Sequence, residues 1–294
     1  MNYLGIDVGG TFIKYAEMDE TGRILSGGKV PTPYTTPEDY METLVSLVNK
    51  DYAGICISAP GFIDTEHGIC VSGGSLEYLP AYYPLGELLE KRLGVPVTVE
   101  NDARCAALAE LWKGSLAGCR NALTVVIGTA VGMVVILDGR IYRGSHNIAG
   151  EIGYTLMENE YRDIYDFFGM RFSTAGMLKK IADVDEKYQD MSGEEAMERY
   201  RNKDEVLFPV IDRHLRDTAR ALYALQCIFD VEKIALGGGI SRNELFLKTL
   251  QEKYAGLYEE IPYGLKPAQI TACAFYNDSN LIGALYRHLY MQKQ

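Results

Sequence analysis

The 294-residue sequence lacks long hydrophobic runs and an excess of positive charge. None of its apolar stretches approaches the roughly 20 residues that a membrane-spanning helix requires, so we expect no membrane partner. The formal net charge is −11, which would repel a phosphate backbone and disfavours general nucleic-acid binding. At the start of the chain, no basic segment precedes an apolar core and a cleavage site, so we expect a cytoplasmic protein.

Clustered cysteines are also missing from the sequence. The chain has six scattered cysteines, and no two of them form a close pair: Cys56, Cys70, Cys105, Cys119, Cys227 and Cys273. In a chain of this size, such scattering is typical of reduced thiols and offers no metal-ligand spacing. The composition is 47% hydrophobic and 23% charged, as in a globular protein with an ample core.

One pattern occurs twice in the chain: an apolar strand, a turn of glycine and threonine, a second strand and a tight turn. The first copy begins with Asn2–Ile6 and turns at Gly9-Gly10-Thr11. The second begins with Asn121–Ile127 and turns at Gly128-Thr129. We therefore predict two related halves that meet near residue 118, each beginning with a β-hairpin.

These turns have the chemistry of a phosphate site. Glycine lets backbone N–H groups approach a phosphate closely, and threonine adds a hydroxyl donor. Asp7 supplies a carboxylate where Mg²⁺ would meet the phosphates, and Lys14 on the same hairpin adds a positive charge. The alternative is a plain hairpin turn. The second Gly-Thr turn favours the phosphate interpretation, since one loop from each half could clamp a triphosphate.

A third glycine run, Gly237-Gly238-Gly239, follows a predicted buried strand. Adenine or ribose could lie against its bare backbone. Alternatively, the three glycines serve only close packing.

Asp102 lies where a short strand becomes a helix. The predicted buried side of this helix consists of Ala103, Ala106, Ala107, Leu108, Leu111 and Trp112. Strand ends line ligand crevices in α/β proteins, and phosphoryl transfer to an alcohol needs one group to accept the hydroxyl proton. Asp102 could be that general base, and Asn101 could hold a neighbouring sugar hydroxyl. The alternative is that either residue merely caps the helix, because both types are favoured caps.

Other candidate sugar contacts lie in loops. The stretch from Gly144 to Tyr154 is rich in glycine and polar side chains, and its Glu151 could bind two vicinal hydroxyls. The loop of Gly61 and the Ser72–Ser75 run could form further walls. Each of them could equally be an ordinary surface loop.

Together these stretches resemble the ROK family of sugar kinases and related repressors, over nearly the whole chain. The motifs that carry the resemblance occur in the family's order: Asp7-Val8-Gly9-Gly10-Thr11 with Lys14, Ala59-Pro60-Gly61 with Asp64, Glu100-Asn101-Asp102-Ala103, Gly128-Thr129, Ala149-Gly150-Glu151-Ile152-Gly153, Leu236-Gly237-Gly238-Gly239-Ile240 and Asp278-Ser279-Asn280-Leu281-Ile282-Gly283-Ala284. Each motif alone has little specificity, whereas the ordered set is specific.

The resemblance implies an α/β, actin-like ATPase fold of the sugar-kinase and Hsp70 type, with two similar lobes and a cleft between them. The small domain would be residues 1–117, with the terminal helix 280–294 packing back on it, and the larger domain residues 118–279. The resemblance also implies a homodimer, a small-molecule sugar substrate, and ATP with Mg²⁺ as cofactors.

Roles follow from the same resemblance. Asp102 would be the general base for a hexose hydroxyl, usually the one on carbon six, and Asp7 would face Mg²⁺, directly or through water. The expected sugar-binding residues are Gly61, Gly73, Gly74, Asn101, Asp102, Glu151 and Tyr154. The expected nucleotide-binding residues are Asp7, Gly9, Gly10, Thr11, Lys14, Gly128, Thr129, Gly237, Gly238 and Gly239.

Two features depart from the family pattern. Tyr154 stands where the family commonly has histidine, and the stretch from Glu158 to Lys180 has no cysteine where the family commonly has a zinc motif. We therefore expect no zinc site. A zinc-free chain with this tyrosine is similar to the family's glucokinases and β-glucoside kinases of Gram-positive bacteria.

Other functions stay open. Within the family, the acceptor could be N-acetylmannosamine, N-acetylglucosamine or fructose. A repressor is disfavoured, because the first hairpin begins at residue 3 and leaves no room for a helix-turn-helix domain. A non-catalytic sugar-sensing protein of this fold is the remaining alternative of another class, whereas an ATPase chaperone would need a substrate-binding domain downstream.

Overall fold

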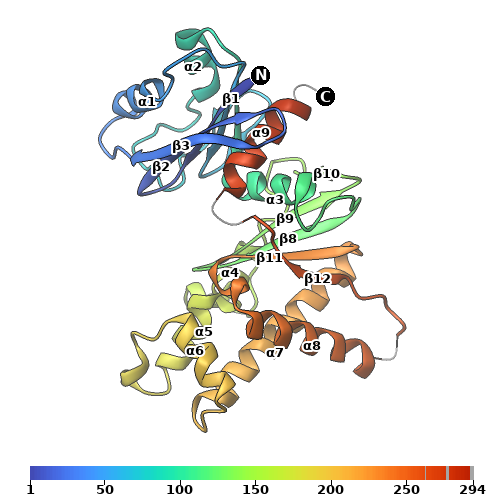
Figure 1. Ribbon diagram of the computed structural model, residues 1–294. Coiled ribbons are helices and arrows are strands. Elements are labelled where there is room, and N and C mark those ends of the chain that lie inside the picture. Colours follow the sequence, from blue (N-terminus) through green and yellow to red (C-terminus); the bar gives the residue numbers. More distant parts are fainter. Residues whose placement is uncertain (262, 276–277, 292–294) are drawn as a thin grey trace. The chain divides into compact units, whose positions relative to one another are not determined.

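A computed structural model describes residues 1–261, 263–275 and 278–291 of the chain. These residues form two compact units, which we describe separately (Figure 1). Unit 1 comprises Met1–Ala117 and Asn277–Gln294, and unit 2 comprises Gly118–Tyr276. The last three residues of the predicted terminal helix, 292–294, lie outside the described residues.

The core of unit 1 is a five-stranded sheet with the order β3-β2-β1-β4-β7. Strands β1, β2 and β3 are antiparallel neighbours, whereas β1, β4 and β7 run parallel. The strands are β1 (Asn2–Val8), β2 (Phe12–Asp19), β3 (Ile24–Pro31), β4 (Ile55–Ala59) and β7 (Val97–Asn101). A small hairpin of β5 (Ile63–Asp64) and β6 (Ile69–Cys70) follows β4.

Helices cover both faces of this sheet. They are α1 (Pro37–Ser46), α2 (Leu85–Leu93), α3 (Asp102–Lys113) and α9 (Ser279–Tyr290). Leu4, Ile6 and Val8 of β1 share one hydrophobic cluster with residues of α1 and α2. On the other face, Tyr3 and Cys56 share a cluster with residues of α3 and α9. Every residue of β1 from Tyr3 to Val8 is buried, and so is every residue of β4, because helices cover both faces of the sheet.

Unit 2 contains a second five-stranded sheet with the order β10-β9-β8-β11-β12. Its strands are β8 (Ala122–Ile127), β9 (Val131–Leu137), β10 (Arg140–Ile141), β11 (Lys233–Gly237) and β12 (Gln269–Ala272). Strands β8, β9 and β10 form an antiparallel meander, and β8, β11 and β12 are parallel. This arrangement has the same order and directions as in unit 1, as the repeated strand-turn-strand pattern predicts.

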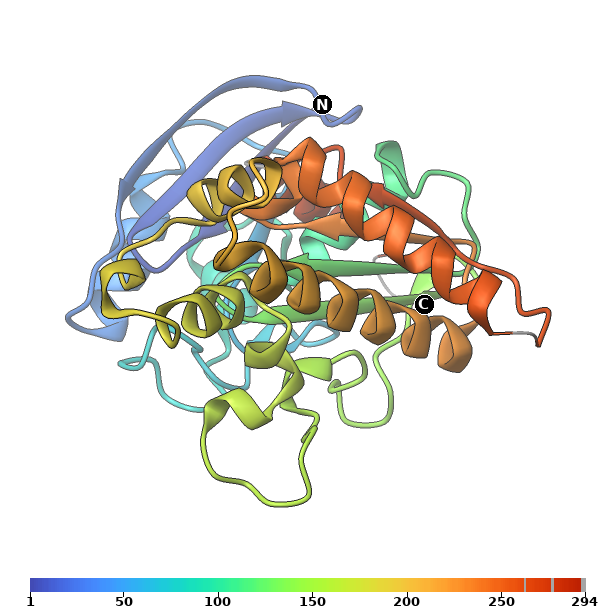
Figure 2. The same ribbon diagram turned by 90° about the horizontal axis from the view of Figure 1, so that it is seen from below.

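The helices of unit 2 pack on this sheet around one large apolar cluster. They are α4 (Phe168–Arg171), α5 (Thr174–Ala182), α6 (Gly193–Arg201), α7 (Leu207–Phe229) and α8 (Glu244–Glu260). Figure 2 shows the two long helices, α7 and α8, side by side over the strands. Short 3-10 turns η1 (Ile152–Tyr154), η2 (Ile164–Asp166), η3 (Glu186–Tyr188) and η4 (Gly239–Arg242) connect these elements.

Candidate active site

The carboxyl ends of β1, β4 and β7 place the predicted polar residues of unit 1 at one edge of its sheet. The parallel pairing sets Asp7 beside Ser58, Ser58 beside Glu100, and Ala59 beside Asn101. Parallel strands end on the same edge, and ligands of α/β proteins bind there. Sequence positions almost 100 residues apart therefore become neighbours.

Asp7 is buried at this edge and its carboxylate is held in place. Its Oδ1 accepts hydrogen bonds from Ser58 Oγ at 3.1 Å and from Asn280 Nδ2 at 2.9 Å. Lys14 lies directly opposite Asp7 on β2, with its Nζ 3.9 Å from Asp7 Oδ2. The hairpin thus pairs the predicted metal-side carboxylate with the predicted phosphate-binding lysine.

The turn between β1 and β2 carries the other predicted phosphate donors. Its backbone is fixed by a bond from Gly9 N–H to Phe12 O at 3.1 Å and by one from Thr32 Oγ to Gly9 O at 2.7 Å. Gly10 is half-buried and Thr11 is exposed. The predicted donors therefore lie near the surface, in a turn that these two hydrogen bonds hold.

Asn101 and Asp102 perform different tasks at the start of α3. Asn101 is the cap of the helix, since its Oδ1 accepts the Arg104 N–H at 3.1 Å. Asp102 Oδ1 accepts from Ala103 N–H at 2.7 Å and from Asn101 Nδ2 at 3.0 Å. Among the described residues, no hydrogen bond to Asp102 Oδ2 is found, so this oxygen is available to a substrate.

The environment of Asp102 suits a proton acceptor. Burial raises the pKa of the Asp102 carboxyl above its usual value, and the nearby charge of Asp7 adds to this rise. The hydrogen bonds from Ala103 and Asn101 oppose the shift. A carboxyl with a raised pKa is a stronger base when ionised, which is the property that general-base catalysis needs.

The glycines predicted for the sugar site bring two loops together next to Asn101. Gly61 has φ +87°, and a Cβ there would lie 2.2 Å from Ser72 O. Gly74 has φ +57°, and a Cβ there would lie 2.7 Å from Gly61 N, while at Gly73 it would lie 2.3 Å from Leu76 O. Gly61 O accepts from Asn101 Nδ2 at 3.0 Å. These positions require glycine because the loops touch through their backbones.

Unit 2 has a pocket of about 800 Å³ beside the turn between β8 and β9. Three of the predicted nucleotide-binding residues line it, namely Gly128, Thr129 and Gly239. The first residues of α5 and α6 form other parts of its wall. The volume is in the range of cavities that hold small ligands and cofactors.

Several residues of this pocket were not singled out from the sequence as ligand contacts: Thr174, Ser192, Glu198, Arg201, Arg242 and Asn243. Thr174 N–H donates to Gly128 O at 3.0 Å, and the Thr174 hydroxyl is buried with no hydrogen-bond partner among the described residues. The sequence feature that could have pointed to these residues is the pair of helix caps next to them. Ser173 caps α5, and Ser192 forms a capping box with Glu195 at α6.

The three consecutive glycines have different environments. Gly237 packs inside β11, where a Cβ would lie 3.2 Å from the Val126 side chain. Gly238 has φ +92°, and a Cβ there would lie 2.1 Å from Ile127 O. A Cβ at Gly239 would meet no atom within 4 Å. Gly237 and Gly238 thus allow close packing, while only Gly239 of the three lines the pocket.

Glu151 and Tyr154, the remaining predicted sugar contacts, lie in a loop of unit 2 that runs along β9. A Cβ at Gly150 would lie 2.8 Å from Met133 O, so the backbones touch there. Glu151 is exposed at the start of η1, and Tyr154 is 71% exposed. No pattern in the sequence indicated the 3-10 turn that contains Tyr154.

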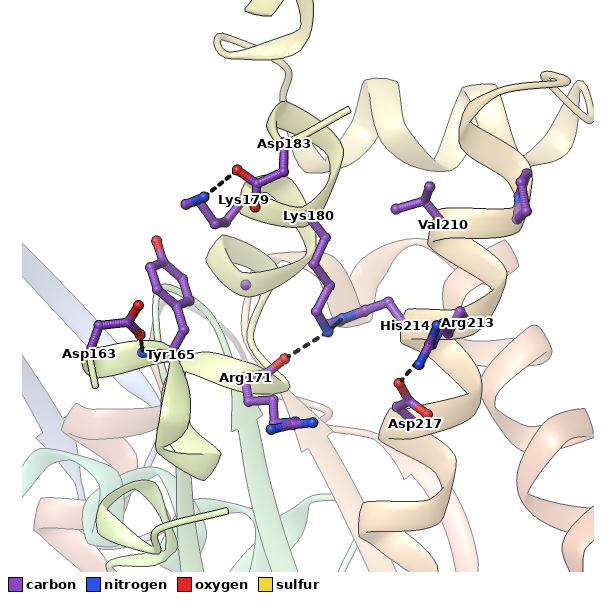
Figure 3. Close-up of a pocket in the computed structure, with 12 residues that line it drawn as sticks. Asp163, Tyr165, Arg171, Lys179, Lys180, Asp183, Val210, Arg213, His214 and Asp217 are labelled. Atoms are coloured by element: carbon purple, nitrogen blue, oxygen red, sulfur yellow. Dashed lines mark hydrogen bonds and ion pairs between the residues drawn. The ribbon is translucent and has the colours of Figure 1, made fainter. Parts of the chain in front are cut away.

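A second pocket of unit 2, of about 720 Å³, lies between α5 and α7 (Figure 3). Lys180 Nζ donates to Arg171 O at 3.3 Å and to His214 Nδ1 at 3.2 Å. Burial, with a contribution from the Lys180 charge, lowers the pKa of His214 to about 3. None of the predicted site residues lines this pocket.

The described part of the chain contains no group of three or more His, Cys, Asp or Glu side chains arranged to hold a metal. The predicted lack of a zinc site stays a prediction. No helix in the same residues combines the length and apolar character needed to cross a membrane.

Comparisons with known proteins agree with this architecture. The chain is 30% identical to the β-glucoside kinase of Klebsiella pneumoniae, over 97% of this chain and 95% of that protein. A ROK family protein from Streptococcus pneumoniae TIGR4, solved in complex with sucrose, superposes with a TM-score of 0.89 at 30% identity, covering 100% of both chains. A ROK family glucokinase from Streptomyces griseus, solved with glucose and AMPPNP, has a TM-score of 0.75 at 25% identity, covering 97% of this chain and 98% of that one.

The predicted fold class is confirmed, since these structural neighbours have the actin-like ATPase fold. The ROK family profile matches residues 3–288, nearly the full length of the sequence. This chain therefore belongs to the ROK family.

Proposed function

We propose that this protein is an ATP-dependent carbohydrate kinase that phosphorylates a hexose hydroxyl, on carbon six, of glucose or a β-glucoside. The observation that carries the proposal is Asp102, a partly buried carboxylate with a raised pKa and one oxygen free to accept a proton. Relatives named as β-glucoside kinase and glucokinase, one of them solved with glucose and the ATP analogue AMPPNP, support it.

In the proposed reaction, Asp102 Oδ2 accepts the proton of the sugar hydroxyl as its oxygen attacks the γ-phosphorus. The bond from that phosphorus to the bridging oxygen breaks, and ADP leaves with the electron pair. The protein's main contributions are to position the reactants and to neutralise charge. Gly9, Gly10, Thr11, Lys14, Gly128 and Thr129 are the proposed phosphate contacts.

The residues around Asp7 fit a magnesium ion. The Asp7 and Asp102 carboxylates lie near enough for the charge of Asp7 to raise the pKa of Asp102, and carboxylate oxygens are hard ligands that Mg²⁺ prefers. When bound, Mg²⁺ neutralises negative charge on the phosphates. Asp7 would hold it, directly or through water, while Ser58 and Asn280 keep the carboxylate oriented.

The proposed sugar contacts are Asn101, Gly61, Gly73, Gly74, Glu151 and Tyr154, together with Asp102. The phenol of Tyr154, in place of an imidazole, would change the contacts near carbons one and two, so that a substituent on the anomeric carbon is tolerated. We also propose that the protein is a homodimer, which sedimentation analysis would test.

A substrate screen tests the acceptor. ADP release would be measured with glucose, cellobiose, fructose, N-acetylglucosamine and N-acetylmannosamine. We expect turnover of glucose or cellobiose, with the phosphate found on O6. Turnover of N-acetylmannosamine alone would refute the proposed acceptor while retaining the kinase activity.

The variant Asp102→Asn tests the base. It keeps the side-chain size and leaves the Asn101 cap in place, so folding should be unchanged. General-base catalysis is worth roughly 10²- to 10⁴-fold, so we expect kcat to fall by that amount with little change in nucleotide affinity. Wild-type kcat in this variant would refute the mechanism.

A further inference from the structure

A row of polar side chains crosses the sheet of unit 1 behind the candidate site. The register places Asp7 of β1 beside Ser58 of β4, and Ser58 beside Glu100 of β7. Neighbouring residues in register point to the same face of a sheet. This face is the one that packs against α3 and α9, since Cys56, two positions before Ser58, belongs to the apolar cluster shared with those helices.

Helix α9 contacts this row at both ends. Near its start, Asn280 Nδ2 donates to Asp7 Oδ1 at 2.9 Å. Seven residues later, Arg287 Nε lies 3.8 Å from Glu100 Oε2. Seven residues of α-helix rise about 10.5 Å, and two strand spacings amount to about 9.6 Å. The helix spacing thus matches the distance across the row from β1 to β7.

A chain of contacts leads from Arg287 to the proposed base. Glu100 is fully buried, and its Oε1 accepts the Asn101 N–H at 2.9 Å and the Thr65 hydroxyl at 3.3 Å. Arg287 Nη2 also donates to Thr65 O at 3.3 Å. The Asn101 side chain in turn donates to Asp102 Oδ1 at 3.0 Å. The backbone of Asn101, from which Asp102 follows, is therefore anchored by a buried ion pair.

We infer that Asn280 and Arg287 of α9 are positioning residues for the phosphoryl transfer, a conclusion that rests on the proposed function. Asn280 orients the carboxylate of Asp7 toward the magnesium ion. Arg287, through Glu100 and Asn101, holds Asp102 toward the sugar. Helix α9 thereby aligns two carboxylates that lie more than 170 positions before it in the sequence, and neither positioning residue touches the reacting atoms.

The two residues predict different kinetic defects. Asn280→Ala removes the donor to Asp7, and supporting contacts of this kind are worth about 10- to 100-fold in metal affinity. We expect the Mg²⁺ concentration for half-maximal rate to rise by about that factor, with the KM for sugar unchanged. Arg287→Met leaves the Glu100 carboxylate buried without this cation, and we expect kcat to fall about tenfold or more with the Mg²⁺ dependence unchanged.

A rescue experiment separates positioning from simple damage to the fold. The double variant Glu100→Gln/Arg287→Met removes both buried charges, and we expect it to recover part of the kcat lost in Arg287→Met. Arg287→Lys, which keeps the charge, should lie between Arg287→Met and the wild type. Tyr290→Phe, at an exposed position of the same helix, is the matched control and should retain wild-type kinetics.

The same assays distinguish failure of the inference from failure of the proposed function. If the wild type phosphorylates no sugar, or Asp102→Asn is fully active, the proposed function is wrong. A second outcome would overturn the inference alone. In that outcome the wild type is active and Asp102→Asn is inactive, as the proposed function requires. The variants Asn280→Ala and Arg287→Met, however, fold and keep the wild-type kcat and Mg²⁺ dependence. Should Arg287→Met not fold, the double variant and Arg287→Lys decide the outcome for Arg287 by the same criteria.

Discussion

At the residue scale, Asn101 and Asp102 divide two tasks that either side chain could perform. Capping a helix requires an oxygen that reaches back to the N–H group three residues on, and Asn101 provides it. The adjacent carboxylate does not cap the helix, and the hydrogen bonds that it accepts from Asn101 and Ala103 both go to Oδ1. Burial raises its pKa, so the same short motif contains a structural group and a reactive one.

His214, between α5 and α7, predicts a pH-dependent stability. In the folded protein its pKa is lowered to about 3 by burial and by Lys180, whereas an unfolded histidine titrates near 6.5. Between these values the unfolded chain binds a proton that the folded one does not, so acid favours unfolding. We expect His214 to reduce the free energy of unfolding by up to about 1.4 kcal/mol for each pH unit below 6.5.

Urea unfolding between pH 4.5 and 7.5 would measure this effect. His214→Gln should flatten the loss of stability in acid, while the exposed control His146→Gln should leave the slope as in the wild type. The flattening will be partial, since burial also lowers the pKa of His288 to about 4. An unchanged slope in His214→Gln would contradict the prediction.

At the element scale, the contact between α3 and α9 depends on one glycine. A Cβ at Gly283 of α9 would lie 1.7 Å from the Cys105 carbonyl oxygen of α3, so the helices touch through their backbones. Of the six residues that the sequence predicted on the buried side of α3, Ala107 and Leu108 are buried. The other four are only half-buried, namely Ala103, Ala106, Leu111 and Trp112. In the structure Arg104, Cys105, Ala109 and Glu110 are buried too, and Cys105 belongs to the apolar cluster that α3 shares with α9.

Two glycine-to-alanine substitutions in helices should therefore have opposite effects. Gly283→Ala forces α3 and α9 apart, and we expect it to lower the free energy of unfolding by about 1–3 kcal/mol or more. Gly256→Ala in α8, where a Cβ would meet nothing within 4 Å, should raise it by up to about 1 kcal/mol. Chemical denaturation would measure the free energy of unfolding of both variants. If both variants were destabilised, or neither, the prediction of opposite effects would be wrong.

The strands that were not predicted from the sequence were missed for one physical reason. Strand β3 is exposed along nearly its whole length and contains Gly27 and Gly28, so it has no apolar alternation to detect. It exists because β2 offers it a hydrogen-bonding edge. The small hairpin of β5 and β6 is likewise too short for a periodic pattern. Pairing with a neighbour, rather than local preference, creates these strands.

At the scale of the whole molecule, ligand binding should increase the free energy of unfolding. A ligand that binds only the folded state at 100 times its Kd adds about 2.7 kcal/mol to the free energy of unfolding. We expect AMPPNP with Mg²⁺ to raise the unfolding temperature of the wild type and of Asp102→Asn alike. Gly239→Phe should abolish this shift, because its ring would enter the pocket of unit 2 that Gly239 lines.

Differential scanning fluorimetry with and without nucleotide would measure the shift. The ligand-free unfolding temperature of Gly239→Phe is the control, and it should stay near the wild-type value since the position is open. A full nucleotide-induced shift in this variant would place the nucleotide elsewhere.

The amino-acid sequence by itself determined the family, the strand-turn-strand pattern of each half and most buried elements, because these depend on local periodicity and on motifs in a set order. Tertiary structure decided which of these residues meet. It brought Asp7, Ser58 and Glu100 into one row, assigned the helix cap to Asn101, and separated Gly239 from the packing role of Gly237 and Gly238. The contacts of Asn280 and Arg287 with that row join residues almost 200 or more positions apart, and no local pattern encodes a contact of that range.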